Sequence, residues 1–202
     1  MEKEIENKPS LESLFLDFEH PNPNINNMAA RKMNIFWREE SINKLINNLN
    51  SDDLQLRRKS VKALSYFDNG LIKKLFEAYT SNNDFNFKLS CLKVLVIFSA
   101  NNDVNPFIDE IKYFINDSLD NDSPEVILTL VSLLRQLGKP SIPILLSLIK
   151  DKNILRAKAA ITALGEMKDS SSLKDLKELA LDKSIDSFLR DSASEAIYNF
   201  DF

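Results

Sequence analysis

Apolar residues recur along the chain at the three- and four-residue spacing of amphipathic helices, and short polar stretches separate the apolar segments. Two segments are nearly the same phrase, LRRKSVKAL at residues 56–64 and RAKAAITAL at residues 156–164. Both mix small with charged residues and end on Ala-Leu. A single amphipathic helix would show this residue pattern once, whereas a stack of helix pairs would show it in every layer. The pattern therefore indicates an internal repeat.

The repeat has a nearly constant period. Six phrases align on a final apolar residue, at positions Met33, Leu64, Leu95, Leu134, Leu164 and Ile197. The separations of 31, 31, 39, 30 and 33 residues lie in the range of solenoid repeats. Each repeat is expected to contain a first helix, a polar turn and a second helix. The longest separation predicts a longer junction between the third and fourth repeats.

Turn-forming residues set the ends of these helices. The first helices are expected at approximately 10–18, 40–49, 71–79, 106–118, 141–150 and 172–182. The turns between helices are rich in Asn, Asp, Ser and Pro, which cap free backbone N–H groups or fix φ. Gly70, Gly138 and Gly165 are each expected just after a second helix, as left-handed C-caps.

The sequence thus predicts an all-α protein, a right-handed α-solenoid or superhelix of about six HEAT-like helical hairpins. One domain is expected over residues 1–202, with repeats at roughly 10–37, 40–69, 70–101, 105–138, 140–168 and 171–200. Three glycines in 202 residues are fewer than a β-sandwich or a Rossmann fold needs for its turns. The signatures of tetratricopeptide and ankyrin repeats are absent from the sequence.

The second helices of a solenoid commonly line its concave, ligand-binding face. Positions spaced by four residues on each second helix predict a strip of outward-facing side chains. The strip is basic in the first three repeats, apolar in the middle and acidic at the end. It suits a protein partner or a flat apolar ligand with acidic groups, and an ordinary solvated surface is the alternative. The predicted binding residues are Arg31, Arg58, Lys62, Tyr66, Leu89, Lys93, Ile97, Leu128, Gln136, Lys158, Glu166 and Glu195.

Charge and composition narrow the chemistry further. A net charge of −4 argues against a nucleic-acid partner. The only cysteine, Cys91, excludes an internal disulfide and is expected to be a small buried residue. The only histidine, His20, lies in an expected turn, and no nucleotide-binding, nucleophile or metal motif occurs, so neither a catalytic nor a metal site is predicted. Without a signal peptide or an apolar run long enough to span a bilayer, the chain is expected to be cytoplasmic, with no transmembrane segment.

Two stretches carry a more specific resemblance. They are HPNPN at residues 20–24 and DSFLRDSASEAI at residues 186–197. Together with the phrases between them, they resemble the E/F-type phycobilin lyase family of HEAT-like proteins over nearly the whole chain. One family feature is incomplete, an arginine at the start of each second helix. That position holds Asn26, Arg57, Lys88, Ile127, Ala157 and Arg190.

The resemblance implies a role in attaching an open-chain bilin to a cysteine of a phycobiliprotein, in a cyanobacterium or a related phototroph. It is strongest to the phycoerythrin branch of the family, which implies an accessory, chaperone-like protein for attachment of a phycoerythrobilin-type pigment. The implied partners are a phycoerythrin subunit, the β subunit favoured, and a larger CpeY-type lyase. Phycobilin would be a transient ligand, and no cofactor is expected.

The roles of individual residues are hypotheses that rest on the count of outward-facing positions alone. Arg58, Lys62 and Lys93 are expected to pair with bilin propionates, and Tyr66 to stack on a pyrrole ring. Two alternatives stay open. The chain is either a bilin lyase, alone or as half of a heterodimer, or a generic HEAT-repeat scaffold for protein interactions.

Overall fold

The computed structural model describes residues 8–105 and 108–201, and within these ranges it contains helices and no strand. The chain divides into two compact units, residues 1–110 (unit 1) and residues 111–202 (unit 2). Each unit is described by itself. The first two residues of the helix expected at 106–118 lie outside the described residues. The single array over residues 1–202 and its right-handed superhelix stay predictions.

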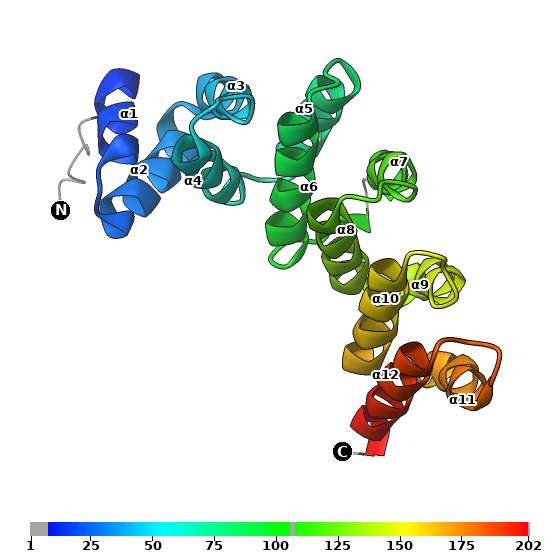
Figure 1. The fold of residues 1–202 in the computed structure, drawn as a ribbon. Helices are drawn as coiled ribbons and strands as arrows, with labels where there is room; N and C mark the ends of the chain where they lie inside the picture. Colours follow the sequence, from blue (N-terminus) through cyan, green and yellow to red (C-terminus); the bar gives the residue numbers. More distant parts are fainter. Residues whose placement is uncertain (1–7, 106–107, 202) are drawn as a thin grey trace, which may run out of the picture. The chain divides into compact units, whose positions relative to one another are not determined.

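Unit 1 consists of three helical hairpins (Figure 1). Its helices are α1 (Leu11–Glu19), α2 (Pro23–Phe36), α3 (Arg38–Asn48), α4 (Leu54–Leu64), α5 (Gly70–Thr80) and α6 (Phe85–Ser99). The two helices of each hairpin pack on each other, and α4 also packs against both α2 and α6. The second helices of unit 1 therefore form one layer with α4 in the middle.

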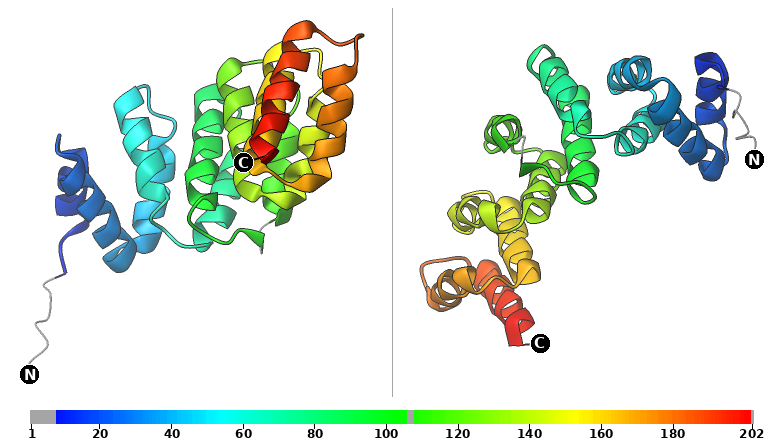
Figure 2. Two further views of the ribbon diagram at one scale, coloured as in Figure 1. Left: turned by 90° about the horizontal axis from the view of Figure 1, so that it is seen from below. Right: turned by 180° about the vertical axis from the view of Figure 1, so that it is seen from behind.

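Unit 2 repeats this plan. Its elements are most of α7 (Ile108–Ser118), which begins in the last residues of unit 1, and then α8 (Pro124–Leu137), η2 (Lys139–Ser141), α9 (Ile142–Leu148), α10 (Ile154–Met167), η3 (Ser170–Ser172), α11 (Leu173–Leu181), α12 (Ser187–Tyr198) and η4 (Asn199–Asp201). Helix α10 packs against both α8 and α12. Figures 1 and 2 show α9 and α11 on one side of the layer formed by α8, α10 and α12. The all-α class and the order of hairpins are confirmed.

The residues used to align the repeats are core residues. Met33, Leu64, Leu95, Leu134 and Leu164 have no exposed surface. Ile197, on α12 in the sixth hairpin, is only partly buried. The position four residues earlier holds a small side chain in every repeat except the fourth, which has Leu130, and Ser60, Cys91 and Ala160 are all fully buried there. The expectation that Cys91 is a small buried residue is confirmed.

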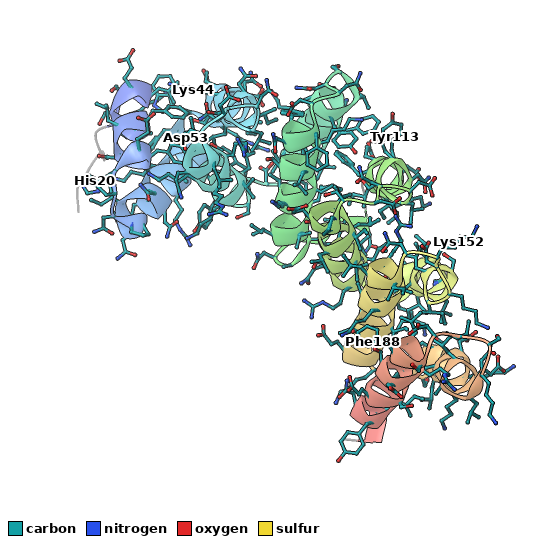
Figure 3. All side chains as sticks on the ribbon, in the orientation of Figure 1. His20, Lys44, Asp53, Tyr113, Lys152 and Phe188 are labelled. Atoms are coloured by element: carbon teal, nitrogen blue, oxygen red, sulfur yellow. The ribbon has the colours of Figure 1, made fainter. Side chains whose placement is uncertain are left out.

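Side-chain caps explain where most second helices begin. Asp53 accepts hydrogen bonds from the N–H groups of Gln55 and Leu56, at 2.7 and 3.3 Å (Figure 3). Equivalent caps precede four other second helices, and the capping residues are Asn22, Asp84, Asn153 and Asp186. Helix α8 begins at Pro124, whose missing N–H costs little at a first helical position. The polar turns therefore act as helix starts, as the sequence predicted.

Two of the three glycines have a different role from the one expected. Gly138 does cap α8 with a positive φ of 71°. Gly70, however, is the first residue of α5, and Gly165 lies inside α10. The left-handed cap of α10 is Lys168, with φ 52°. Gly165 is required for close packing, because a Cβ built on it would lie 2.7 Å from the Cβ of Ala196 on α12.

Replacing Gly165 with Ala should therefore separate α10 from α12. The clash involves the backbone of Ala196, at 2.8 Å, which cannot rotate away. We expect Gly165→Ala to lower the free energy of unfolding by about 1–3 kcal/mol, measured by urea denaturation. Gly70→Ala is the matched control, because the contact there is the mobile end of the Arg38 side chain. Equal stability of the two variants would contradict the packing role of Gly165.

Candidate functional site

The residues predicted to bind a ligand lie on second helices of both units, except Tyr66, which lies in the turn directly after α4. All but one reach the surface at least in part: Arg31, Arg58, Lys62, Tyr66, Lys93, Ile97, Leu128, Gln136, Lys158, Glu166 and Glu195. Leu89 does not, since it is 7% exposed, and its expected place on the outer face is wrong. Helix α6 buries side chains around most of its circumference, which leaves only a narrow exposed stripe.

Three of these residues gather at a hollow between α2 and α4 in unit 1, with a volume of about 330 Å³. We call it the α2–α4 hollow. Its lining residues are Phe18, Pro21, Pro23, Asn26, Asn27, Ala30, Gln55, Arg58, Lys59, Lys62, Ala63 and Tyr66. Arg58, Lys62 and Tyr66 are the three that the sequence predicted. Lys93 and Ile97, on α6, are not part of this hollow.

Two lining residues hold the hollow in shape. The side-chain amide of Asn26 donates to the carbonyl groups of residues 17, 18 and 20 at the end of α1, at 2.6–3.2 Å. The ammonium group of Lys59 donates to the carbonyl oxygen of Glu19 at 2.8 Å. These bonds satisfy carbonyl groups that the end of a helix leaves unpaired. They also fix the HPNPN turn against α4, so the most specific sequence stretch forms one wall of the hollow.

The functional groups that remain in the α2–α4 hollow are mostly cationic. Arg58 and Lys62 are exposed on α4, one helical turn apart. The guanidinium group of Arg31, on α2, lies 4.8 Å from the centre of the Tyr66 ring. This arrangement stabilises the ring position and places a third cation beside the hollow. The hollow can therefore bind an anionic group.

A second hollow lies between α8 and α10 in unit 2, with a volume of about 460 Å³. We call it the α8–α10 hollow. Its lining residues are Leu128, Val131, Ser132, Arg135, Leu155, Lys158, Ala159, Thr162, Ala163 and Glu166. Of the predicted residues, it contains Leu128, Lys158 and Glu166.

The α8–α10 hollow is more apolar. Leu128 and Leu155 are 50% and 36% exposed, although both are large hydrophobic side chains. At one end, Arg135 forms an ion pair with Glu166 at 2.6 Å. The ammonium group of Lys158 lies 4.2 Å from the ring centre of Phe188, which is labelled on α12 in Figure 3. The hollow therefore offers apolar contact with one cation, because the second cation is already paired.

Two predicted residues lie apart from the α8–α10 hollow. Gln136 lines a neighbouring hollow near Gly138, which shares Arg135 and Glu166 with the α8–α10 hollow, and Glu195 is exposed on α12. The structure therefore sorts most of the predicted residues into two local groups, one in each unit.

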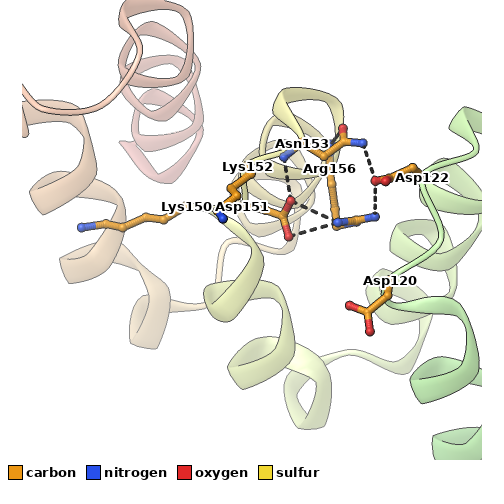
Figure 4. A pocket seen from close by; sticks show the side chains of 7 residues that line it. All are labelled: Asp120, Asp122, Lys150, Asp151, Lys152, Asn153 and Arg156. Carbon is orange, nitrogen blue, oxygen red and sulfur yellow. Dashed lines mark hydrogen bonds and ion pairs between the residues drawn. The ribbon is translucent and has the colours of Figure 1, made fainter.

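Arg156, at the start of α10, is a buried cation that the sequence analysis missed. Its side chain is only 7% exposed. Nη1 donates to both carboxylate oxygens of Asp151 at 3.1 Å, and Nη2 donates to Asp122 and to the carbonyl oxygen of Asn121 at 3.0 Å. Figure 4 shows the guanidinium group between the two carboxylates. Arg156 thus joins the turn before α8 to the turn before α10.

This contact bears on one gap in the arginine pattern, the gap in the fifth repeat. The expected position in the fifth repeat was Ala157, but the side chain that performs the role comes from the preceding residue, Arg156. In the second repeat, Arg57 donates to the carbonyl oxygen of Ser51 at 2.5 Å. Both arginines tie a second helix to the turn before it. The visible signal was an Asp in the turn followed by an Arg inside the helix.

The remaining residues singled out from the sequence have structural surroundings. His20 is exposed and accepts a hydrogen bond from the N–H of Asn22 at 3.0 Å. Burial raises the pKa of the Cys91 thiol well above its ordinary value. Within residues 8–105 and 108–201, no group of three His, Cys, Asp or Glu side chains is placed to hold a metal ion. None of the helices in the described part of the chain is both long and apolar enough to cross a bilayer.

Comparison with known proteins agrees with this geometry. Residues 114–197 match the family model for HEAT repeats. An engineered protein solved by the Northeast Structural Genomics Consortium superposes with a TM-score of 0.52 at 19% identity, covering 95% of this chain and 98% of that one. Residues 114–197 are therefore similar to HEAT repeats, and the helical fold of the chain is similar to that of a solved engineered protein.

Two curated relatives define the resemblance more narrowly. "Uncharacterized phycocyanin operon protein Z" of Pseudanabaena tenuis (strain PCC 7409) is 25% identical over 93% of this chain and 94% of its own length. "Bilin biosynthesis protein CpeZ" of Synechococcus sp. (strain WH8020) is 25% identical over 69% of this chain and 78% of its own length. The chain is similar to CpeZ-like HEAT-repeat proteins, and the resemblance seen in the sequence is confirmed.

Arg156 should contribute more to stability than a surface arginine. Arg156→Ala removes four hydrogen bonds of a buried side chain and should lower the free energy of unfolding by about 1–3 kcal/mol. Arg135→Ala breaks an ion pair whose side chains are 42% and 47% exposed. That control should change stability by about 0–1 kcal/mol. Urea denaturation of both variants measures the difference, and an equal loss would refute the role given to Arg156.

Cys91 should be unreactive in the folded protein. Because its thiol is buried and its pKa is raised, little thiolate is present at neutral pH. We expect DTNB to label the native protein only at the rate of unfolding and to label one thiol at once in denaturant. Rapid labelling of the native protein at neutral pH would show that Cys91 is accessible.

Proposed function

We propose that this protein is an accessory factor for the attachment of phycobilins to phycobiliproteins. The observation that carries the proposal is the similarity to a phycocyanin operon protein over 93% of the chain, joined by similarity to a bilin biosynthesis protein. The more specific form is a chaperone-like role with a phycoerythrin subunit, the β subunit favoured, and a larger CpeY-type lyase. The pigment served is of the phycoerythrobilin type.

The chemistry of attachment suits a protein of this kind. In bilin attachment the nucleophile is a cysteine thiol of the substrate protein, so an accessory factor needs binding surfaces more than a nucleophile of its own. The hollows between second helices supply such surfaces in both units. Exposed leucines beside charged groups are typical of sites that bind a partner.

The α8–α10 hollow suits transient contact with the bilin. Leu128 and Leu155 offer apolar surface to a tetrapyrrole. Lys158 can form a charge-assisted hydrogen bond with a propionate. The ammonium group of Lys158 lies over the Phe188 ring of α12, and this contact helps to hold it at the hollow. A bilin held here could be delivered to the lyase or to the subunit.

Co-expression tests the proposal. A phycoerythrin β subunit and the enzymes that make phycoerythrobilin are produced with or without a CpeY-type lyase, and with or without this chain. We expect this chain to raise the yield of soluble, covalently coloured subunit only when the lyase is present. Colour without any other lyase would favour the alternative of a lyase. No effect on yield or colour would refute the accessory role and leave a generic scaffold.

A variant of the α8–α10 hollow makes the test specific. The double change Leu128→Asp and Leu155→Asp places carboxylates where the proposal requires apolar contact, and it should reduce the added yield to the level seen without the chain. Both side chains are already partly exposed, so folding should be retained. Leu181→Asp is the matched control, since Leu181 is 80% exposed on the first helix α11. Full activity of the double variant would exclude this hollow.

A further inference from the structure

We propose that the α2–α4 hollow of unit 1 binds an extended, acidic peptide segment of a protein partner. This inference deepens the proposed function by naming the chemistry of the partner, and it rests on that function only for the partner's identity. It uses a different hollow from the one assigned to the bilin.

Charge is the first argument. The lining includes Arg58, Lys59 and Lys62 and no acidic residue. Neither Arg58 nor Lys62 forms an ion pair within the part of the chain that the structure describes, whereas the ammonium group of Lys59 is held by the end of α1. Two adjacent cations in a concave site attract an anionic ligand strongly, because the walls of the hollow reduce screening by water. The hollow is therefore positive although the chain as a whole has a net charge of −4.

The amide side chains are the second argument. Asn27 and Gln55 line the hollow from α2 and α4. Neither side-chain amide has a hydrogen-bond partner among residues 8–105 and 108–201. Each amide offers both donors and an acceptor, which is what the backbone of an extended peptide requires. Cations for acidic side chains and amides for the backbone thus lie in one site.

The apolar and aromatic side chains that line the hollow offer little surface to a flat ring ligand. Ala30 and Ala63 line the hollow from the two helices, but they are only 1% and 2% exposed and contribute little apolar contact surface. A tetrapyrrole or a nucleic acid base needs a free aromatic face for stacking. Tyr66, which was expected to stack on a pyrrole ring, already has Arg31 over one face at 4.8 Å. Phe18 is 1% exposed. The site therefore favours a peptide over a flat ring system.

Binding to the isolated full-length chain tests the inference. The probe is a short, capped, fluorescein-labelled peptide of alternating glutamate and serine, followed by fluorescence anisotropy. We expect saturable binding that weakens as salt is added. The matching lysine–serine peptide should not bind. Absence of binding by the acidic peptide at low salt would overturn the inference.

Variants locate the site. The double change Arg58→Ala and Lys62→Ala should raise the Kd roughly tenfold or more, because two charge-assisted contacts are lost. Gln55→Ala should raise it by a few fold. Lys73→Ala, an exposed lysine on the first helix α5 of the same unit, is the matched control and should leave the Kd unchanged. Circular dichroism confirms folding. Equal effects of Lys73→Ala and the double change would place the binding elsewhere.

Competing ligands decide the remaining alternatives. Biliverdin and oligothymidylate are added as unlabelled competitors of the bound peptide. Little displacement by either one supports a peptide site. Displacement by biliverdin at lower concentration than by unlabelled peptide would make the hollow a bilin site, and the same result with oligothymidylate would make it a nucleic-acid site. These measurements need no lyase or phycobiliprotein. A negative result would therefore refute the peptide site without refuting the accessory function, which the co-expression test addresses.

Discussion

The architecture of each unit depends on burying one second helix between two others. Helix α4 lies between α2 and α6, and α10 lies between α8 and α12. Helices can approach to about 8–10 Å only where the side chains between them fit. Ser60 and Ala160 meet that requirement at equivalent positions and are fully buried. The same packing decides which side of each second helix stays accessible. The contacts that form the core therefore also determine where the binding surface lies.

The sequence predicted those elements whose signals are local or periodic. The six hairpins, the capped helix starts and the burial of Cys91 follow from spacing and from turn residues. The predictions that were wrong depend on contacts between helices. The prediction of Gly165 as a helix cap is wrong because the sequence does not show how closely α12 packs there, where a Cβ built on Gly165 would lie 2.7 Å from the Cβ of Ala196. Leu89 was placed outside because the helical period does not tell how many neighbours surround α6.

In the candidate site too, the sequence predicted what depends on helical spacing and missed what depends on contacts between side chains. Counting along second helices identified Arg58, Lys62 and Leu128, all of which line hollows. It could not tell that Arg31 covers Tyr66, or that Arg135 neutralises Glu166. These side-chain pairs determine which ligand each hollow can bind, because some charged groups are already paired within the protein and others remain available. One hollow becomes cationic with free amides, and the other becomes apolar with a single available cation.

Partners are expected to bind to the solvent-exposed sides of the second helices, where the two hollows lie. Hydrogen–deuterium exchange of the full chain, with and without a phycoerythrin β subunit and a CpeY-type lyase, tests it most directly. We expect slower exchange in α2 and α4 of unit 1 and in α8 and α10 of unit 2 when the partners are present. Protection confined to the first helices α3, α5, α9 and α11, or no change in any helix, would contradict it.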